Sequence, residues 1–363
     1  MHPRNKHRIY LDYRELAKKQ TGLQPFVFEN QWGGASIDYS DPDALEELTR
    51  ALLAEFYDIR HWRLPKGYLC PPVPQRADYI HVLADLLQHS LHEMEPRGPS
   101  VCGLDVGTGA SCIYSLLGTR EYGWSFIASD IDETALTNAE KLLNENGLKE
   151  RITLRQQQDP RRALRGILLP HEVVAFSICN PPFHETIEHA RQAASSKWKR
   201  LGKELKRKNY QGQEPELCCE GGEVGFVTRL MEESAKVRFR SRCLWYSSLL
   251  SRHSSLQPIF ERLGELGAKR RRFELQQGRN VKWVVAWSFF PRTERRKRLE
   301  EMLQTGRDGP NEVSAARAEG PRRPRAKTKV TKKSRKKGVT GYGLPEDLAW
   351  SRKRGSKEST RFG

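Results

Sequence analysis

Short apolar runs alternate with amphipathic segments through the middle and the second half of the chain. The apolar runs are rich in β-branched and aromatic residues and predict buried strands at 101–105, 124–130, 152–154, 173–179, 243–250 and 282–290. The segments between them have helical spacing and predict helices at 113–117, 132–146, 226–235 and 259–266. Because strands and helices alternate, the sequence predicts an α/β fold with one doubly wound domain.

This domain is predicted to span 96–291 and to follow an ordered N-terminal extension, 1–95. In the extension, Asp41-Pro42 opens an amphipathic helix that runs through Leu53. A proline-rich stretch at 68–74 predicts a rigid, extended segment, and helical spacing resumes at 79–91. We expect the extension to support the cofactor site and to face RNA.

Two polar segments carry much of the positive charge. Residues 184–222 are basic and poor in apolar periodicity, and they predict a long substrate loop over the mouth of the active site. Residues 292–363 hold 22 Lys/Arg against 9 Asp/Glu, so most of the net charge of +18 lies in this tail. Its composition predicts disorder beyond residue 304, and its charge fits either an RNA anchor or a nuclear address.

Cysteine usage and hydropathy exclude several classes of protein. The seven cysteines lack the paired spacing of zinc ligands, so we expect a reducing compartment and no metal. No apolar stretch follows the N-terminus as in a secretory signal, and none approaches the roughly 20 residues that span a bilayer. We therefore expect a cytoplasmic monomer without a membrane partner, with the nucleus as the alternative location.

Asn180, Pro181, Pro182 and Phe183 follow the predicted strand at 173–179 and form the candidate catalytic loop. Two prolines end a strand because they lack amide donors and fix their own φ angles. Open α/β sheets place their ligands at the C-terminal ends of strands. The Asn180 side chain and the Pro181 backbone offer two acceptors, and Phe183 offers a stacking face, which suits a planar ring with an exocyclic NH₂ such as adenine. A simple turn with a packed aromatic residue is the alternative.

The predicted strand at 101–105 leads into a glycine-bearing turn that we interpret as the cofactor loop. Asp105, Gly107, Gly109 and Ser111 lie in this turn, where glycines allow close approach of backbone amides to a ligand. Asp130 ends the next predicted strand, at the spacing of an acceptor for ribose hydroxyls. The loop has no lysine that would bind phosphate, so the sequence favours S-adenosylmethionine, a nucleoside cofactor without a phosphate.

Together the two loops predict methyl transfer to an amine. An exocyclic adenine amine is a poor nucleophile because its lone pair is delocalised into the ring. Two acceptors on its hydrogens would direct that lone pair at the methyl carbon, and the displacement would depend on positioning and electrostatics.

Several longer motifs resemble a known family. They are Asp105-Val-Gly-Thr-Gly109, Asn180-Pro-Pro-Phe183, Cys219-Glu-Gly-Gly-Glu223 and Ala286-Trp-Ser-Phe289. They resemble the RNA adenine-N6 methyltransferases that unite bacterial ribosomal RNA large subunit methyltransferase F with the eukaryotic spliceosomal small nuclear RNA enzymes. The resemblance covers about residues 2–290 and implies a Rossmann-like class I methyltransferase domain with S-adenosylmethionine as its cofactor.

The resemblance also implies roles for single residues. Arg76 would bind the methionine carboxylate of the cofactor, with a surface arginine as the alternative. Arg279 and Lys282 would face RNA, with a salt bridge at a strand end as the alternative. From charge alone, the basic start of the chain with Arg4 and Lys6 predicts either an RNA-binding arm or a solvated terminus.

The motifs leave the substrate open. His2-Pro-Arg-Asn5 and Arg76-Ala-Asp-Tyr-Ile-His81 are typical of the bacterial branch and favour large-subunit (23S-type) ribosomal RNA. Gly107-Thr-Gly-Ala-Ser111 and Gln277-Gly-Arg279 are typical of the eukaryotic branch and favour spliceosomal U6 small nuclear RNA. A protein glutamine methyltransferase and a non-catalytic RNA-binding protein are the other hypotheses.

Overall fold

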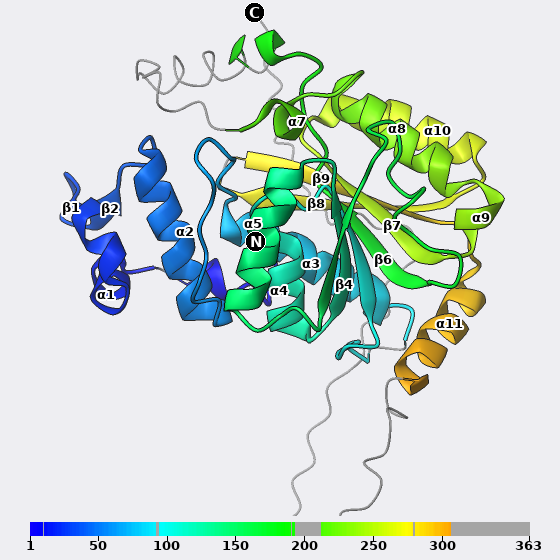
Figure 1. Cartoon of the computed structure of the whole chain (residues 1–363), viewed down its shortest axis with the longest axis horizontal. Coiled ribbons are helices and arrows are strands. Elements are labelled where there is room, and N and C mark those ends of the chain that lie inside the picture. Colours follow the sequence, from blue (N-terminus) through cyan, green and yellow to red (C-terminus); the bar gives the residue numbers. More distant parts are fainter. Residues whose placement is uncertain (10, 92–93, 190, 193–211, 279, 306–363) are drawn as a thin grey trace, which may run out of the picture. The chain divides into compact units, whose positions relative to one another are not determined.

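The computed structural model describes residues 1–305, except for 10, 92–93, 190, 193–211 and 279. Seven strands form one mixed sheet in the order β5-β4-β3-β6-β7-β9-β8 (Figure 1). Their bounds are β3 Cys102–Val106, β4 Ser125–Asp130, β5 Ile152–Gln156, β6 Val174–Cys179, β7 Cys243–Leu250, β8 Lys269–Gln277 and β9 Asn280–Ser288. The first five of these are parallel, and β9 is antiparallel to both of its neighbours. The α/β fold predicted from the sequence is confirmed.

The strand order places the two predicted loops side by side. Strand β3 lies between β4 and β6, and Val106 at its end pairs with Cys179 at the end of β6. The chain leaves β3 and β6 towards opposite halves of the sheet, which is the point where open α/β sheets bind their ligands. The cofactor loop and the catalytic loop therefore start from adjacent strand ends.

Helices cover both faces of the sheet and make its strands apolar on both sides. Side chains of Phe176 and Ala286 join one hydrophobic cluster, with helices α2, α3, α4 and α5. Side chains of Val174 and Trp287 join the other, with α8 and α10. The bounds of these helices are α2 Pro42–Tyr57, α3 Val73–Gln88, α4 Ile113–Tyr122, α5 Glu133–Glu145, α8 Gly222–Ser234 and α10 Leu256–Glu265. Burial on both faces explains why the sequence of these strands is almost continuously apolar.

The N-terminal extension shares its core with the sheet. Leu53 of α2, Leu83 of α3 and Phe176 of β6 belong to the same cluster of buried residues. The predicted boundary at residue 95 therefore separates two stretches of sequence that pack together. The extension also contains elements that the pattern did not indicate: η1 Lys6–Arg8, α1 Tyr13–Lys19, η2 Thr21–Phe26, β1 Val27–Glu29 and β2 Ala35–Ile37.

Several boundaries and one strand differ from the prediction, and α4 runs on to Tyr122, five residues beyond its predicted end. Helix α3 begins at Val73, inside the segment expected to be extended, because Pro74 lies in its first turn, where the missing amide costs no hydrogen bond. Helix α8 begins at Gly222 and not at 226. Strand β8 was not predicted because it is an edge strand in which only Leu275 is buried, so it lacks an apolar pattern.

The remaining described elements are α7 Glu214–Leu217 in the substrate loop, α9 Val237–Arg240 after α8, η4 His253–Ser255 after β7 and α11 Arg292–Thr305 after β9. The basic residues predicted in the loop at 197–208, Arg279 and the tail beyond residue 305 lie outside the described residues. Among the helices that the structure describes, none has the length and apolar composition to cross a membrane.

Candidate active site

The catalytic loop presents an unused acceptor at the end of β6. Asn180 is half-buried, and its side-chain oxygen Oδ1 is buried without a hydrogen-bond partner among the described residues. Pro181 is buried and Phe183 is half-buried. A buried acceptor without a partner is costly, and such groups occur where a ligand or a catalytic step uses them.

Lys282 of β9 lies beside this loop. Its Nζ is 4.9 Å from the centre of the Phe183 ring, a cation–π geometry. The structure thus brings together one predicted RNA-contacting residue and one predicted catalytic residue from segments about 100 positions apart in the sequence. A positive charge at this position favours an approaching polyanion.

The segment after the catalytic loop is held by the end of α7 and by the residues that lead into α8. The His184 amide donates to the Leu217 carbonyl and the Cys219 amide donates to the His184 carbonyl, each at 3.0 Å. Gly222 has φ +55°, and a Cβ there would lie 3.4 Å from the Phe183 carbonyl oxygen. Only glycine fits this close approach without strain.

Buried Glu223 connects α8 to the loop after β7. Its Oε2 accepts from the Ser251 amide at 2.8 Å and from the Ser251 hydroxyl at 2.6 Å. Its Oε1 accepts from the Arg252 amide at 3.2 Å and from the Ser255 hydroxyl at 2.5 Å. The carboxylate thus accepts hydrogen bonds from two amides and two hydroxyls of this loop and fixes the loop beside the catalytic residues. Sequence inspection found the Cys219-Glu-Gly-Gly-Glu223 motif but not this role.

Asp105 anchors the cofactor loop and keeps one oxygen free. Its Oδ2 accepts from the Thr108 hydroxyl at 2.8 Å and from the Ser115 hydroxyl at 2.9 Å. Its Oδ1 is buried without a hydrogen-bond partner among the described residues. Full burial raises the pKa of Asp105 to about 6. One oxygen therefore shapes the turn, and the other can accept from a ligand ammonium group.

The two glycines of the loop take the conformation that a ligand-approaching turn requires. Gly107 and Gly109 have φ +73° and +64°. The Gly109 amide donates to Asp130 Oδ2 at 2.8 Å, and the Asp132 amide donates to Asp130 Oδ1 at 3.0 Å. Burial raises the pKa of Asp130. Each carboxylate oxygen keeps a further lone pair for a ribose hydroxyl.

Ser111 and Tyr68 complete the setting of the loop. The buried Ser111 contributes its carbonyl, which accepts from the Trp62 indole NH at 3.1 Å. The Tyr68 hydroxyl donates to Asp132 at 2.6 Å. Both partners come from the N-terminal extension, which therefore makes hydrogen bonds to the predicted cofactor loop and to the start of α5.

Arg76 is a buried cation that lacks an acidic partner among the described residues. Only 4% of it is exposed. Its Nη1 donates to the Tyr114 hydroxyl at 2.7 Å, and its Nε has no partner among the described residues. Burial raises the pKa of Tyr114 to about 12, so this hydroxyl does not supply the missing negative charge at neutral pH. A buried unpaired guanidinium is costly, which favours an anionic ligand group.

Arg76 and Asp105 therefore match the two charges of a free amino acid. The Tyr114 hydroxyl accepts a hydrogen bond from Arg76, and the charge of Asp105 raises the pKa of Tyr114. Arg76 and Asp105 therefore both lie near Tyr114. An unpaired guanidinium suits a carboxylate, and an unpaired carboxylate oxygen suits an ammonium group. These residues fit the methionine end of S-adenosylmethionine, while Asp130 fits its ribose.

Glu216 is a carboxylate at the cofactor loop that the sequence analysis missed. Its Oε2 accepts from the Gln213 amide at 2.9 Å and from the Leu69 amide at 3.2 Å. Its Oε1 lies 3.7 Å from the position of a Cβ on Gly109. Burial raises the pKa of Glu216. The capping-box spacing of Gln213 and Glu216 was a signal for this short helix.

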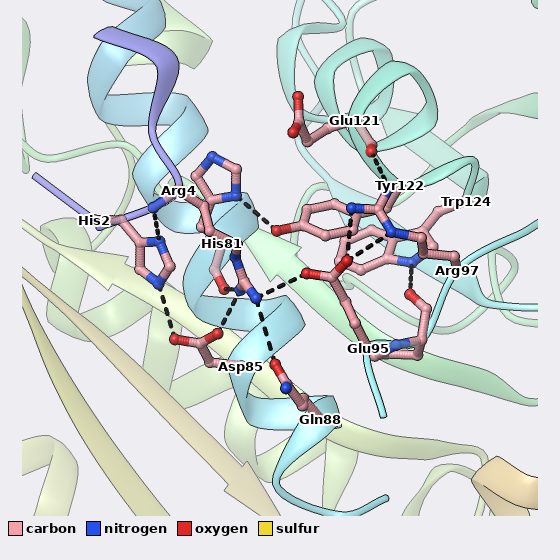
Figure 2. A network of polar contacts seen from close by, with 11 residues as sticks. His2, Arg4, His81, Asp85, Gln88, Glu95, Arg97, Glu121, Tyr122 and Trp124 are labelled. Atoms are coloured by element: carbon pink, nitrogen blue, oxygen red, sulfur yellow. Dashed lines mark hydrogen bonds and ion pairs between the residues drawn. The ribbon is translucent and has the colours of Figure 1, made fainter. Parts of the chain in front are cut away.

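The predicted RNA-binding arm is docked on helix α3 (Figure 2). Arg4 pairs with Asp85 and with Glu95, the latter at 2.8 Å, and Lys6 pairs with Glu121 at 2.6 Å. Both cations thus have acidic partners within the chain. This placement favours a structural role, and their contact with RNA stays a prediction.

The same segment holds the part of α3 that carries Arg76. Asn5 is buried, and its side-chain amide donates to the Pro74 carbonyl at 2.8 Å and to Asp78 at 2.6 Å. The His2 amide also donates to Asp78, at 2.8 Å. Pro74 and Asp78 lie on either side of Arg76 in the sequence, so the segment fixes the turn from which Arg76 extends.

Replacing Asn5 with alanine is therefore expected to raise the KM for the methyl donor by up to about 30-fold, the effect of losing two buried hydrogen bonds of about 1 kcal/mol each. The KM for RNA at saturating donor should stay unchanged. Arg8→Ala is the control, because among the described residues the exposed side chain of Arg8 donates only to the Pro3 carbonyl of the same segment. An effect on RNA and none on the donor would support the predicted arm instead.

The raised pKa of Asp105 predicts a pH effect on cofactor binding. Above about pH 6 the carboxylate is charged and can bind an ammonium group, whereas below it the protonated form cannot. Between pH 7 and 5, donor KM should rise about ten-fold in total, because the charged fraction of a group with a pKa of about 6 falls from about nine-tenths to about one-tenth. Equilibrium binding of donor across this range measures it. If Asp105→Asn bound the donor weakly but kept the same pH profile, another group would cause the titration.

Comparison with known proteins identifies the family. Residues 1–291 match the model of a family described as RNA methyltransferase. The chain belongs to this family. The resemblance noted in the sequence is thereby confirmed.

The chain is similar to curated relatives over most of its length. It is 46% identical to Ribosomal RNA large subunit methyltransferase F of Pseudomonas savastanoi over 301 residues, which cover 81% of this chain and 91% of that protein. It is 41% identical to the protein of the same name from Flavobacterium johnsoniae, over 82% of this chain and 95% of that one.

Solved structures agree with this assignment. The catalytic domain of human METTL16 in complex with the MAT2A 3′UTR hairpin 1 has a TM-score of 0.70 and 33% identity, and the match covers 80% of this chain and 96% of that one. The N-terminal domain of human METTL16 in complex with SAH has a TM-score of 0.65 and 32% identity over 80% and 99% of the two chains. These likenesses confirm the Rossmann-like methyltransferase fold.

Proposed function

We propose that this protein transfers a methyl group from S-adenosylmethionine to the exocyclic N6 amine of an adenine in large-subunit ribosomal RNA. The family is described as RNA methyltransferase, which supports RNA as the substrate. Its relatives are named for the large ribosomal subunit, which supports the RNA of that subunit. The observation that best supports the N6 amine as the methyl acceptor is the buried Oδ1 of Asn180, which has no hydrogen-bond partner among the described residues. The compartment is the bacterial cytoplasm, since these curated relatives are bacterial.

The cofactor is S-adenosylmethionine, whose sulfonium supplies an electrophilic methyl group when it is bound. Arg76 and Asp105 bind the carboxylate and ammonium of its methionine part, and Asp130 binds its ribose. Gly107 and Gly109 bring the loop backbone close, and Ser111 keeps the loop fixed through Trp62. These contacts orient the methyl group towards the neighbouring catalytic loop at the end of β6.

The catalytic loop orients and activates the amine. Asn180 Oδ1 accepts one amine hydrogen, and the Pro181 carbonyl accepts the other. Both contacts favour a pyramidal nitrogen whose lone pair points at the methyl carbon. Pro182 keeps the loop stiff and Phe183 stacks on the base. The nitrogen gains the methyl group and afterwards loses one proton to solvent.

Lys282, packed against Phe183, contacts the RNA backbone next to the target base. Arg279 belongs to the same proposed surface by sequence and lies outside the described residues. We leave Arg4 and Lys6 out of this surface, because their charges are paired within the chain. The protein is proposed to act as a monomer.

Labelled S-adenosylmethionine tests the substrate class. The purified enzyme is incubated with size-fractionated RNA and, separately, with protein from cells that lack it. Label in large-subunit RNA is expected. Label confined to a small nuclear RNA would keep the chemistry and overturn the ribosomal substrate. Label in protein alone would indicate a glutamine methyltransferase and overturn the proposal.

A further inference from the structure

A cavity of about 470 Å³ lies next to the catalytic loop, on the side away from the cofactor loop. Its walls include Phe183, His184, Gly222, Glu223, Arg252 and Ser255. They come from the loop after β6, the N-terminal end of α8 and the loop after β7. Because β6 lies between β3 and β7, this cavity and the cofactor loop flank the catalytic loop on opposite sides. Its volume is in the range of small-molecule sites, about 300–1,000 Å³.

One side of the cavity is fixed by hydrogen bonds within the chain. The four hydrogen bonds that Glu223 accepts fix the turn from Ser251 to Ser255 against α8. Gly222 brings the start of α8 within van der Waals distance of the backbone at Phe183 and His184. A cavity fixed by buried hydrogen bonds loses little entropy when a ligand enters.

The polar groups of the cavity suit a nucleotide. His184 Nδ1 is buried and has no hydrogen-bond partner among the described residues. Burial and the charges of Arg252 and His189 lower the pKa of His184, so its ring is neutral and offers one donor and one acceptor. Arg252 is exposed and supplies a guanidinium. Glu223 is already satisfied by its four donors, and Glu185 is exposed.

We propose that this cavity binds the nucleotide adjacent to the target adenine, with its base against His184 and its phosphate at Arg252. The inference rests on the proposed function and adds a subsite to it. An adenine that leaves its stack to reach Asn180 brings the adjacent nucleotide close to the site, because the two share a backbone phosphate. Proteins bind such splayed bases in pockets, by stacking on the base and by hydrogen bonds to its edge. Phe183 is the wall that the two sites share.

The test uses His184→Phe, which keeps a ring without its nitrogens, and Arg252→Ala. Arg238→Ala is the matched control, because it removes one exposed positive charge on α9, outside the cavity wall. The substrate is the ribosomal RNA fragment that contains the target adenine. Each cavity variant should raise the KM for this fragment about ten-fold, with kcat and donor KM unchanged. Arg238→Ala should change little. Thermal unfolding checks that all three variants are folded.

Abasic substitutions then locate the nucleotide. The RNA carries an abasic site immediately 5′ or immediately 3′ of the target adenine. At one of these positions the wild type should lose affinity, and the penalty of His184→Phe should disappear. If the penalty persists in full with both abasic RNAs, the cavity does not hold either neighbour and the inference is wrong. If the wild type methylates no RNA at all, the proposed function fails, and the inference with it.

Discussion

Replacing Asn180 with alanine is expected to reduce kcat by at least ~10²-fold, the loss seen when one polar group that stabilises a transition state is removed. Donor binding should stay within a few-fold of the wild type, because Asn180 is proposed to contact the base and not the cofactor. The buried Oδ1 without a partner is the reason to expect so large a loss. Single-turnover rates with saturating RNA, together with calorimetric binding of the donor, separate the two quantities.

Asn180→Asp is the matched variant. A carboxylate oxygen can also accept an amine hydrogen, so this variant should keep more activity than Asn180→Ala. Equal loss in both variants would mean that the shape of the loop, and not its acceptor, matters. Full turnover in Asn180→Ala would show that amine activation does not depend on this side chain.

Replacing Arg76 with methionine is expected to weaken donor binding at least ~30-fold, since truncating one partner of a buried charge pair costs about 2–5 kcal/mol. The same change removes an uncompensated buried charge, so the free protein should unfold at an unchanged or higher temperature. Stability and function should thus change in different directions. Thermal unfolding with and without the donor measures both effects, because a ligand that binds the folded state raises the unfolding midpoint.

Tyr114→Phe is the control for this change. It removes the 2.7 Å hydrogen bond to Arg76 but keeps the guanidinium, so the donor should still raise the unfolding midpoint. If Arg76→Met bound the donor as tightly as the wild type, Arg76 would not bind the methionine carboxylate. A large loss of stability in Arg76→Met without a loss of binding would indicate a purely structural arginine.

The central sheet could be predicted because its strands are buried on both faces. Runs such as 173–179 and 243–250 are apolar apart from one or two serines, so no partner needs to be known to recognise them. The edge strand β8 shows the opposite case. Its Lys-Arg-Arg-Arg start is stable as a strand only because β9 pairs with it. Strand β9 follows β8 directly in the sequence, but the mostly polar pattern of β8 carries no strand signal of its own, since strand preference depends on the neighbours that a strand packs against.

The site was predictable where function depends on a loop after a strand. Asp105 and Asn180 each follow an apolar run, and their residue type indicates their chemistry. Glu216 and Glu223 were different, because their roles arise from backbone amides at Leu69 and Ser251. Such contacts between remote segments leave little trace in one sequence. The basic N-terminus shows the same limit, since its acidic partners lie on α3 and beyond.

The arrangement explains how one sheet serves two ligands. The cofactor loop follows β3 and the catalytic loop follows β6, while the cavity lies towards β7. The N-terminal extension stabilises the cofactor side through Trp62, Tyr68 and Asn5. Helix α8 stabilises the substrate side through Glu223. Changes in the extension should therefore affect the donor first, and changes near α8 should affect RNA first.

The most direct measurement is the identity of the methylated nucleoside. Large-subunit ribosomal RNA from cells without the enzyme is treated with wild type or Asn180→Ala and labelled donor, then digested and separated by mass. The account predicts a single labelled nucleoside, N6-methyladenosine, formed by the wild type and absent with the variant. Label on a ring nitrogen, on a ring carbon or on another base would contradict the claim that Asn180 and Pro181 present an exocyclic adenine amine to the methyl group.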